Sequence, residues 1–159
     1  GVADRGACAP QPARGGHGGG VLPSKSSRCR GRVGGRAGQA FVPPLPGNDL
    51  PGCFVYRTLD DVAAIKAWAE DGGRSTGLVI GGGLLGLEAA NALRSLGLSV
   101  QVVEMAPYPM PQQLGEGAGR MLGSWVGSLG VDLRCGVVPS CFEAGPEGEI
   151  GGGPLEEAE

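Results

Sequence analysis

One short stretch constrains the fold of this chain more than any other. In VIGGGLLGLEAANAL, three glycines at Gly81, Gly83 and Gly86 form the pattern G-x-G-x-x-G. An apolar run leads directly into the first glycine, and a helical pattern follows the last. In such a turn the first glycine lets the chain reverse tightly, the second admits a phosphate close to the backbone, and the third lets the helix pack against the strand. The stretch therefore predicts a strand, a glycine turn and a helix in direct succession.

The glycine pattern is weak evidence by itself, because 33 of the 159 residues are glycine. At that frequency the triplet occurs at roughly one start in a hundred, so about one chance match is expected in a chain of this length. The context adds the specificity. A strand over 77–80 precedes the turn, a helix over 84–96 ends at Gly97, and a second strand over 98–103 ends at Glu104. This unit of about 28 residues has the size of a parallel crossover, which predicts an α/β fold with a partial Rossmann-like parallel sheet and flanking helices.

The acid at the end of the second strand indicates which ligand the turn takes. A helix that begins at a glycine turn presents free N–H groups and its positive end to a pyrophosphate. Glu104 lies 23 residues after Gly81, where a carboxylate can accept both ribose hydroxyls. A 2′-phosphate would meet that negative charge, and the following MAPYPMPQQ contains no Arg or Lys. We therefore predict NAD(H) rather than NADP(H) as the cofactor; the alternative for Glu104 is a solvated acid at a strand end.

Further elements flank this unit. Thr58 and Asp61 have the spacing of a capping box at the start of an amphipathic helix that stops at Gly72-Gly73. Before it, a proline-rich extended path leads to a strand candidate over 53–56. After the second strand, an apolar stripe predicts a core-facing helix that its glycines weaken, and a third strand follows over 131–133. The stripe is Ala118, Met121, Leu122, Trp125, Val126 and Leu129. We expect three parallel strands in the order 3-2-1.

The two ends of the chain differ in charge. Residues 1–40 hold seven Lys and Arg against one acid, with no periodic apolar pattern, and we expect a disordered or foreign Gly/Arg-rich segment. An RNA-binding arm and a transit peptide are the alternatives there. Residues 41–159 hold six Lys and Arg against fifteen acids, which makes nucleic-acid binding by this part unlikely. Residues 136–159 are expected to be a loose, disordered acidic tail.

Cysteine and histidine usage predicts no metal site. The five cysteines form no C-x-x-C pair, and His17 is the only histidine. We expect free thiols in a reducing compartment and a cytoplasmic location, with an organelle as the alternative. No apolar run is long enough for a membrane span.

Several segments together resemble the flavin-dependent pyridine-nucleotide oxidoreductases. PPLPG, VYRTLDD, GGGLLGLEAA and PMPQQL carry the resemblance, which covers about residues 41–134. Within this group the chain is most similar to the flavoprotein portion of NAD(P)H-dependent nitrite reductase large subunits. Rubredoxin reductases, ferredoxin reductases and the flavoprotein of assimilatory nitrate reductase share much of this resemblance. The resemblance implies that 41–58 close a FAD domain and that 59–135 are an incomplete NAD-binding domain.

The family resemblance also implies a function. NADH would pass hydride to FAD, and electrons would continue to iron–sulfur and sirohaem centres that reduce nitrite. The resemblance places Glu88 near the nicotinamide. The sequence alone allows another reading, in which Glu88 is an acid in the first turn of the helix that the helix dipole favours. Residues 1–40 show no FAD-binding glycine turn, and the cluster-binding cysteines are missing. We therefore expect the NADH-binding portion of a larger enzyme, without its electron-accepting domains; the alternatives are a non-catalytic fragment and an interaction module.

Overall fold

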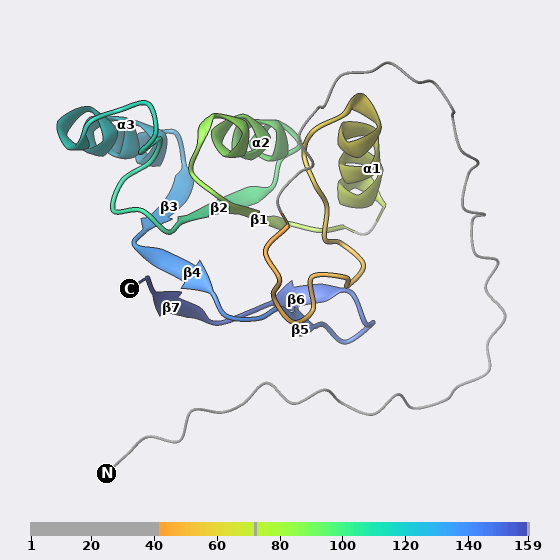
Figure 1. Ribbon diagram of the computed structural model, residues 1–159. Coiled ribbons are helices and arrows are strands. Elements are labelled where there is room, and N and C mark those ends of the chain that lie inside the picture. The colour runs from red at the N-terminus through yellow and green to blue at the C-terminus, as the bar shows by residue number, and fades with distance from the viewer. Residues whose placement is uncertain (1–41, 72, 159) are drawn as a thin grey trace, which may run out of the picture. The chain divides into compact units, whose positions relative to one another are not determined.

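The computed structural model describes residues 42–71 and 73–158 (Figure 1). The first six elements alternate between helices and strands: α1 (Leu59–Glu70), β1 (Thr76–Ile80), α2 (Leu84–Ser95), β2 (Ser99–Glu104), α3 (Glu116–Ser128) and β3 (Val131–Cys135). Four short strands follow: β4 (Val137–Pro139), β5 (Glu143–Ala144), β6 (Ile150–Gly152) and β7 (Leu155–Glu157). The predictions for residues 1–40, including the disordered segment and His17, lie outside the described residues. No helix in the described part is long and apolar enough to cross a membrane.

The central sheet has the predicted topology. β1, β2 and β3 are parallel and lie in the order β1-β2-β3, with Val79 opposite Val102 and Val102 opposite Leu133. Figure 1 shows α2 and α3 on one face of this sheet. Parallel strands need crossover connections, and α2 and α3 provide them. The predicted α/β fold with a partial Rossmann-like sheet is confirmed.

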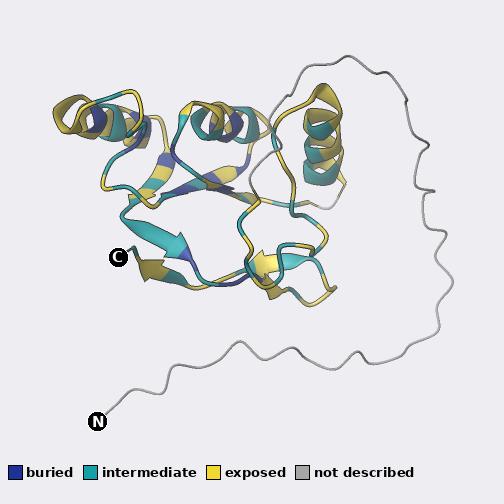
Figure 2. Cartoon of the chain, in the orientation of Figure 1, coloured by how far each residue is buried: buried dark blue, intermediate teal, exposed yellow. Residues whose placement is uncertain are grey.

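Small apolar side chains build the core between the sheet and its helices. Val100 and Val102 point from β2 toward the helices, where Ala89 and Ala90 of α2 and Val126 of α3 meet them. Alanine on the inner face of α2 lets the helix lie close to the strands. Figure 2 shows the buried residues on the sheet and on the helix sides that face it. Because a strand alternates its side chains, Gln101 lies on the opposite face of β2.

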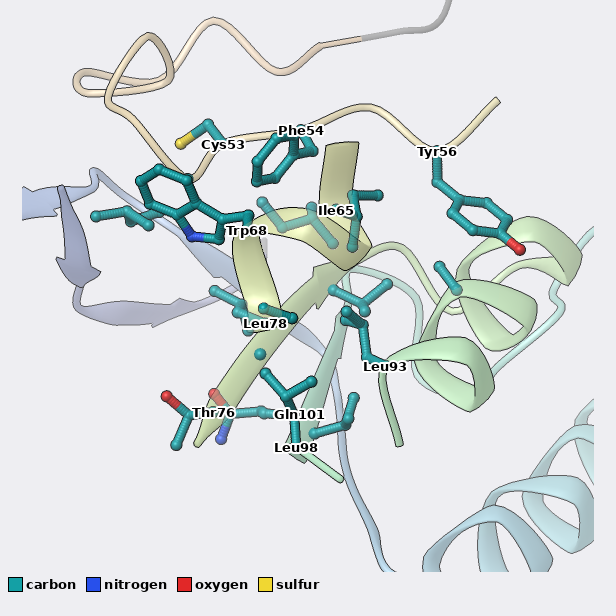
Figure 3. Close-up of a pocket in the computed structure, with 18 of the residues that line it drawn as sticks. Cys53, Phe54, Tyr56, Ile65, Trp68, Thr76, Leu78, Leu93, Leu98 and Gln101 are labelled. Atoms are coloured by element: carbon teal, nitrogen blue, oxygen red, sulfur yellow. The ribbon is translucent and has the colours of Figure 1, made fainter. Parts of the chain in front are cut away.

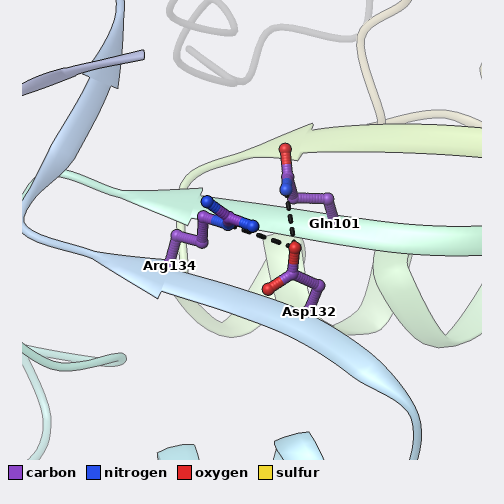
Figure 4. Close-up of polar contacts among 3 residues, drawn as sticks. All are labelled: Gln101, Asp132 and Arg134. Atoms are coloured by element: carbon purple, nitrogen blue, oxygen red, sulfur yellow. Dashed lines mark hydrogen bonds and ion pairs between the residues drawn. The ribbon is translucent and has the colours of Figure 1, made fainter.

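A polar cluster on that opposite face joins two strands. The Gln101 side-chain amide donates to Asp132 Oδ2 at 2.7 Å, and Arg134 Nε donates to the same oxygen at 3.1 Å (Figure 4). The hydrogen bond from Gln101, and secondarily the bond and charge of Arg134, lower the pKa of Asp132. The cluster is exposed and links β2 to β3 at the side-chain level.

The capping box at α1 is confirmed. The Asp61 N–H donates to the Thr58 hydroxyl oxygen at 3.1 Å, and the Thr58 N–H donates to Asp61 Oδ2 at 2.8 Å. The strand predicted over 53–56 is wrong, because this segment pairs with no strand. Its Phe54 instead packs edge-on against Trp68 of α1 with ring centroids 5.9 Å apart.

The predicted apolar stripe of α3 is only partly correct. Val126 is buried and Leu122 is partly buried, but Met121 is 75% exposed and Trp125 is 64% exposed. The inner face is made by Gly119, Leu122, Gly123 and Val126. A side chain at Gly119 would collide with the Tyr108 ring. Two of the glycines that were expected to weaken this helix, Gly119 and Gly123, therefore belong to its contact face, and Met121 and Trp125 point outward.

The disordered tail predicted over 136–159 is wrong for the residues that the structure describes. β4 pairs with β7 and β5 pairs with β6, both antiparallel. The Phe142 N–H donates to the Pro46 carbonyl at 2.8 Å, and the Ile150 N–H donates to the Pro51 carbonyl at 2.9 Å. This segment is therefore held by the proline-rich segment, which lies far away in sequence. The sequence pattern of the segment itself could not predict a partner that is so distant in the chain.

Candidate functional site

The glycine turn, residues 81–86, runs from the end of β1 into the first turn of α2. Gly81 has φ +103°, a left-handed conformation that favours glycine, and its N–H donates to the Val103 carbonyl at 2.8 Å. A Cβ at Gly86 would overlap the Gly81 carbonyl oxygen. Gly83 is the N-cap residue of α2, and nothing lies within 4 Å of the place where its Cβ would be. The structure thus brings the three predicted glycines together, with a tight turn, an open position and a close helix–strand approach.

The open position at Gly83 lies at the N-terminal, positive end of α2. The first intrahelical bond runs from the Leu87 N–H to the Gly83 carbonyl at 3.0 Å. The N–H groups before Leu87 belong to the first turn and have no partner within the helix. Such N–H groups and the helix dipole favour an anion at this end. The turn can therefore accept a phosphate group, and its role in binding stays a prediction.

Glu104 ends β2 beside the glycine turn, as expected. Its Oε2 accepts the Gly82 N–H at 2.6 Å, and its Oε1 accepts the Ala106 N–H at 2.8 Å. The residue is half-buried rather than a freely solvated acid. A carboxylate has about four acceptor positions, so each oxygen keeps capacity for a further donor such as a ribose hydroxyl. Binding of a ribose by Glu104 stays a prediction.

Two contacts of the turn could not be predicted from the glycine pattern. Gly82 is buried, and a Cβ there would lie 3.1 Å from the Cβ of Glu104. Its carbonyl accepts the N–H of Met110 at 3.0 Å, and Met110 has the left-handed φ of +55°. The extra glycine between Gly81 and Gly83 was the available signal for Gly82. The prolines around Met110 indicated an irregular loop but not its hydrogen bond.

Glu88 lies in the second turn of α2, apart from these contacts. No acid occupies the first turn of α2, so the first-turn reading of Glu88 is wrong. Its Oε1 accepts the Tyr56 hydroxyl at 3.3 Å. Loss of solvent, and secondarily the charge and hydrogen bond of Glu88, raise the pKa of Tyr56. Sequence reasoning missed Tyr56, because its partner is 32 residues away.

Cys135, which lies beside this site, is not activated. Cys135 ends β3 opposite Glu104, and burial together with the negative charge of Glu104 raises the pKa of its thiol. The thiolate is the nucleophilic form of cysteine. The environment of Cys135 therefore keeps it protonated.

A cavity of about 1600 Å³ runs along β1 and reaches the start of α2 at Leu85 and Gly86. Figure 3 shows Phe54 and Trp68 on one side of it and Leu78 and Leu93 on the other. Neither Gly83 nor Glu104 lines it. The cavity therefore borders the helix side of the glycine turn but not the open position at Gly83 or Glu104. The glycine turn and Glu104 form the candidate site.

Comparison with known proteins agrees with this geometry. The pyridine nucleotide-disulphide oxidoreductase family matches residues 34–152. The chain belongs to this family. Its members use a pyridine nucleotide and FAD, which agrees with the cofactors predicted from the sequence.

Relatives within the family include nitrite reductases. The nitrite reductase [NAD(P)H] large subunit of Klebsiella oxytoca is 59% identical over 94 residues, which are 59% of this chain and 10% of that subunit. The NADH nitrite reductase large subunit of Escherichia coli is 47% identical over 94 residues, 59% of this chain and 11% of that subunit. The chain thus spans about a tenth of the length of these relatives.

Solved structures in the family share the fold. A ferredoxin reductase from Rhodopseudomonas palustris superimposes with a TM-score of 0.64 at 29% identity. The match covers 73% of this chain and 28% of the reductase. A pyridine nucleotide-disulphide oxidoreductase from Desulfovibrio vulgaris has the same TM-score at 28% identity, over 74% of this chain and 30% of that protein.

Proposed function

We propose that this chain is the NADH-binding portion of a flavin-dependent oxidoreductase of the nitrite reductase type. Residues 59–135 form the NAD-binding domain, and residues 41–58 close the FAD domain and link the two. One observation carries the proposal: the glycine turn lies beside Glu104, with the open position at Gly83 facing the start of α2. Family membership and the nitrite reductase relatives support it.

The residues present fit a dinucleotide. The open space at Gly83 admits the pyrophosphate to the backbone, and the first-turn N–H groups of α2 neutralise part of its charge. The remaining acceptor capacity of Glu104 takes the ribose hydroxyls of the adenosine. Gly86 keeps α2 close enough to β1 for these groups to converge.

Glu104 favours NADH over NADPH. A 2′-phosphate would lie against the carboxylate, and like charges at short range repel. The residue after it, Met105, is 66% exposed and supplies no positive charge. Among residues 105–113 there is no Lys or Arg that could compensate.

The bound nicotinamide would donate a hydride, and FAD would accept it. Glu88 is proposed to lie near the nicotinamide, held by the hydrogen bond from Tyr56. This bond connects Glu88 to the segment that is proposed to link the two domains. In residues 42–71 and 73–158, β1 and α2 are the strand and helix joined directly by a glycine turn, and we assign this turn to NADH rather than to FAD.

The electron acceptor is proposed to be a nitrite-reducing centre. The relatives named nitrite reductase large subunits favour it. A reductase that serves a small iron–sulfur protein is the second candidate, favoured by the structural match to a ferredoxin reductase.

Calorimetric titration with NADH tests the binding proposal. Gly83→Glu places a negative side chain where the pyrophosphate approaches, and we expect affinity to fall at least about tenfold, or 1.4 kcal/mol. Gly115→Glu is the matched control, because Gly115 is the N-cap of α3 with nearly the same backbone angles and equally open surroundings. It should bind NADH like the wild type. Equal affinity of all three proteins would contradict the proposal.

A further inference from the structure

Gly82, the second residue of the glycine turn, is held by hydrogen bonds from two sides. The Gly82 N–H donates to Glu104 Oε2 at 2.6 Å, and the Gly82 carbonyl accepts the Met110 N–H at 3.0 Å. Gly82 is buried, so water does not compete for either bond. Its peptide groups are therefore oriented before any ligand arrives.

Glu104 ties this arrangement to the loop after β2, residues 105–114. Its second oxygen accepts the Ala106 N–H at 2.8 Å, and the Ala106 carbonyl accepts the Gly136 N–H at 2.9 Å. Further along, Pro109 is fully buried, and the Met110 carbonyl accepts the Leu114 N–H at 2.9 Å. One carboxylate thus connects the glycine turn, the end of β2 and an anchored loop.

We propose that Glu104 is a positioning residue for the phosphate-binding turn, in addition to its contact with the ribose. The inference rests on the proposed NADH site and deepens it. Removing the carboxylate leaves two backbone N–H groups without their charged acceptor, and Gly82 is then held by Met110 alone. Since the turn presents its backbone to the phosphates, its disorder weakens phosphate binding even for ligands without ribose hydroxyls.

A comparison of two ligands distinguishes this positioning role from ribose recognition. ADP carries the pyrophosphate and both ribose hydroxyls, whereas 2′,3′-dideoxy-ADP keeps the adenine and the pyrophosphate but lacks both hydroxyls. A residue that only reads the ribose affects ADP and leaves dideoxy-ADP unchanged. A residue that positions the turn affects both ligands.

The test is calorimetric titration of both ligands on the full chain and on Glu104→Ala. We expect the dissociation constant for dideoxy-ADP to rise about tenfold, the size expected for losing a hydrogen bond to a charged group. Gln101→Ala is the control, because Gln101 lies on the same strand but donates its hydrogen bond to Asp132 on the opposite face of the sheet. It should leave both affinities unchanged, and circular dichroism at the titration temperature verifies that each variant is folded.

The conservative variant Glu104→Gln keeps the side-chain volume and one acceptor oxygen. It is expected to show a smaller loss of dideoxy-ADP affinity, and it replaces Glu104→Ala if that variant does not fold. Unchanged dideoxy-ADP affinity in the folded variant overturns the positioning role while the NADH site stands. A wild-type chain that binds neither ADP nor NADH overturns the proposed function, and the positioning role with it.

Discussion

The close approach of α2 to β1 makes a specific prediction for Gly86→Ala. The added Cβ would overlap the Gly81 carbonyl oxygen and lie 3.6 Å from Val79 Cγ1. A main-chain carbonyl cannot rotate away as a side chain can, so α2 must move off the strand. Overpacking of this kind costs about 1–3 kcal/mol, and we expect the upper part of this range. Alanine offsets at most about 1 kcal/mol through its higher helix propensity.

The net destabilisation should therefore be about 2 kcal/mol, which lowers the midpoint of thermal unfolding by roughly 8 °C for a unit of the size of residues 40–159. Gly117→Ala is the matched control in the first turn of α3, because nothing lies within 4 Å of its added Cβ. It should leave stability unchanged or raise it by a few tenths of a kcal/mol, within the propensity difference. Unfolding of both variants is followed by circular dichroism. If Gly86→Ala is as stable as Gly117→Ala, the inferred packing of the turn is wrong.

Three further predictions follow from single contacts. Met105→Arg places a cation beside Glu104 and should raise the affinity for NADPH relative to NADH several-fold in calorimetry; an unchanged ratio would refute the position of the ribose. Thr58→Ala removes the cap of α1 and should cost about 1 kcal/mol in urea unfolding, whereas no loss would show that the cap is not formed in solution. Because the folded-state pKa of Asp132 is lowered, its contribution to stability is present above the ordinary carboxyl pKa and disappears as pH falls through the lowered value. Gln101→Leu should raise the pKa of Asp132 measured by NMR titration, and an unchanged pKa would argue against the hydrogen bond between them.

The sequence predicted the elements whose signals are local. The apolar run before Gly81, the helix pattern after Gly83 and the acid at Glu104 lie within one crossover unit, so spacing alone gave the strand, turn, helix and strand. The capping box at Thr58 was equally local, since both partners lie within one helical turn.

Other features depend on partners that are distant in sequence. The strands after β3 are held by carbonyls of Pro46 and Pro51, and nothing in the acidic, glycine-rich sequence of that segment indicates this pairing. The face of α3 was predicted from its largest apolar side chains, but Gly119 faces inward because the Tyr108 ring occupies the space of a side chain. Hydrophobic periodicity weights large side chains, so it placed Trp125 in the core.

The candidate site shows the same division. The three glycines and Glu104 were identified from spacing, whereas their mutual contacts were not. The bond from Met110 to Gly82 requires a left-handed backbone at a residue that rarely adopts one. The bond from Tyr56 to Glu88 crosses from the segment before α1 to α2.

Amide chemical-shift mapping of the full chain during titration with NADH tests the central claim most directly. We expect the largest changes at residues 81–87, which hold the glycine turn and the first turn of α2, and at Glu104 and Ala106 at the end of β2. Changes over β5 and β6 should be small. Shifts absent from the glycine turn at saturating NADH, or concentrated over β5 and β6, would contradict it.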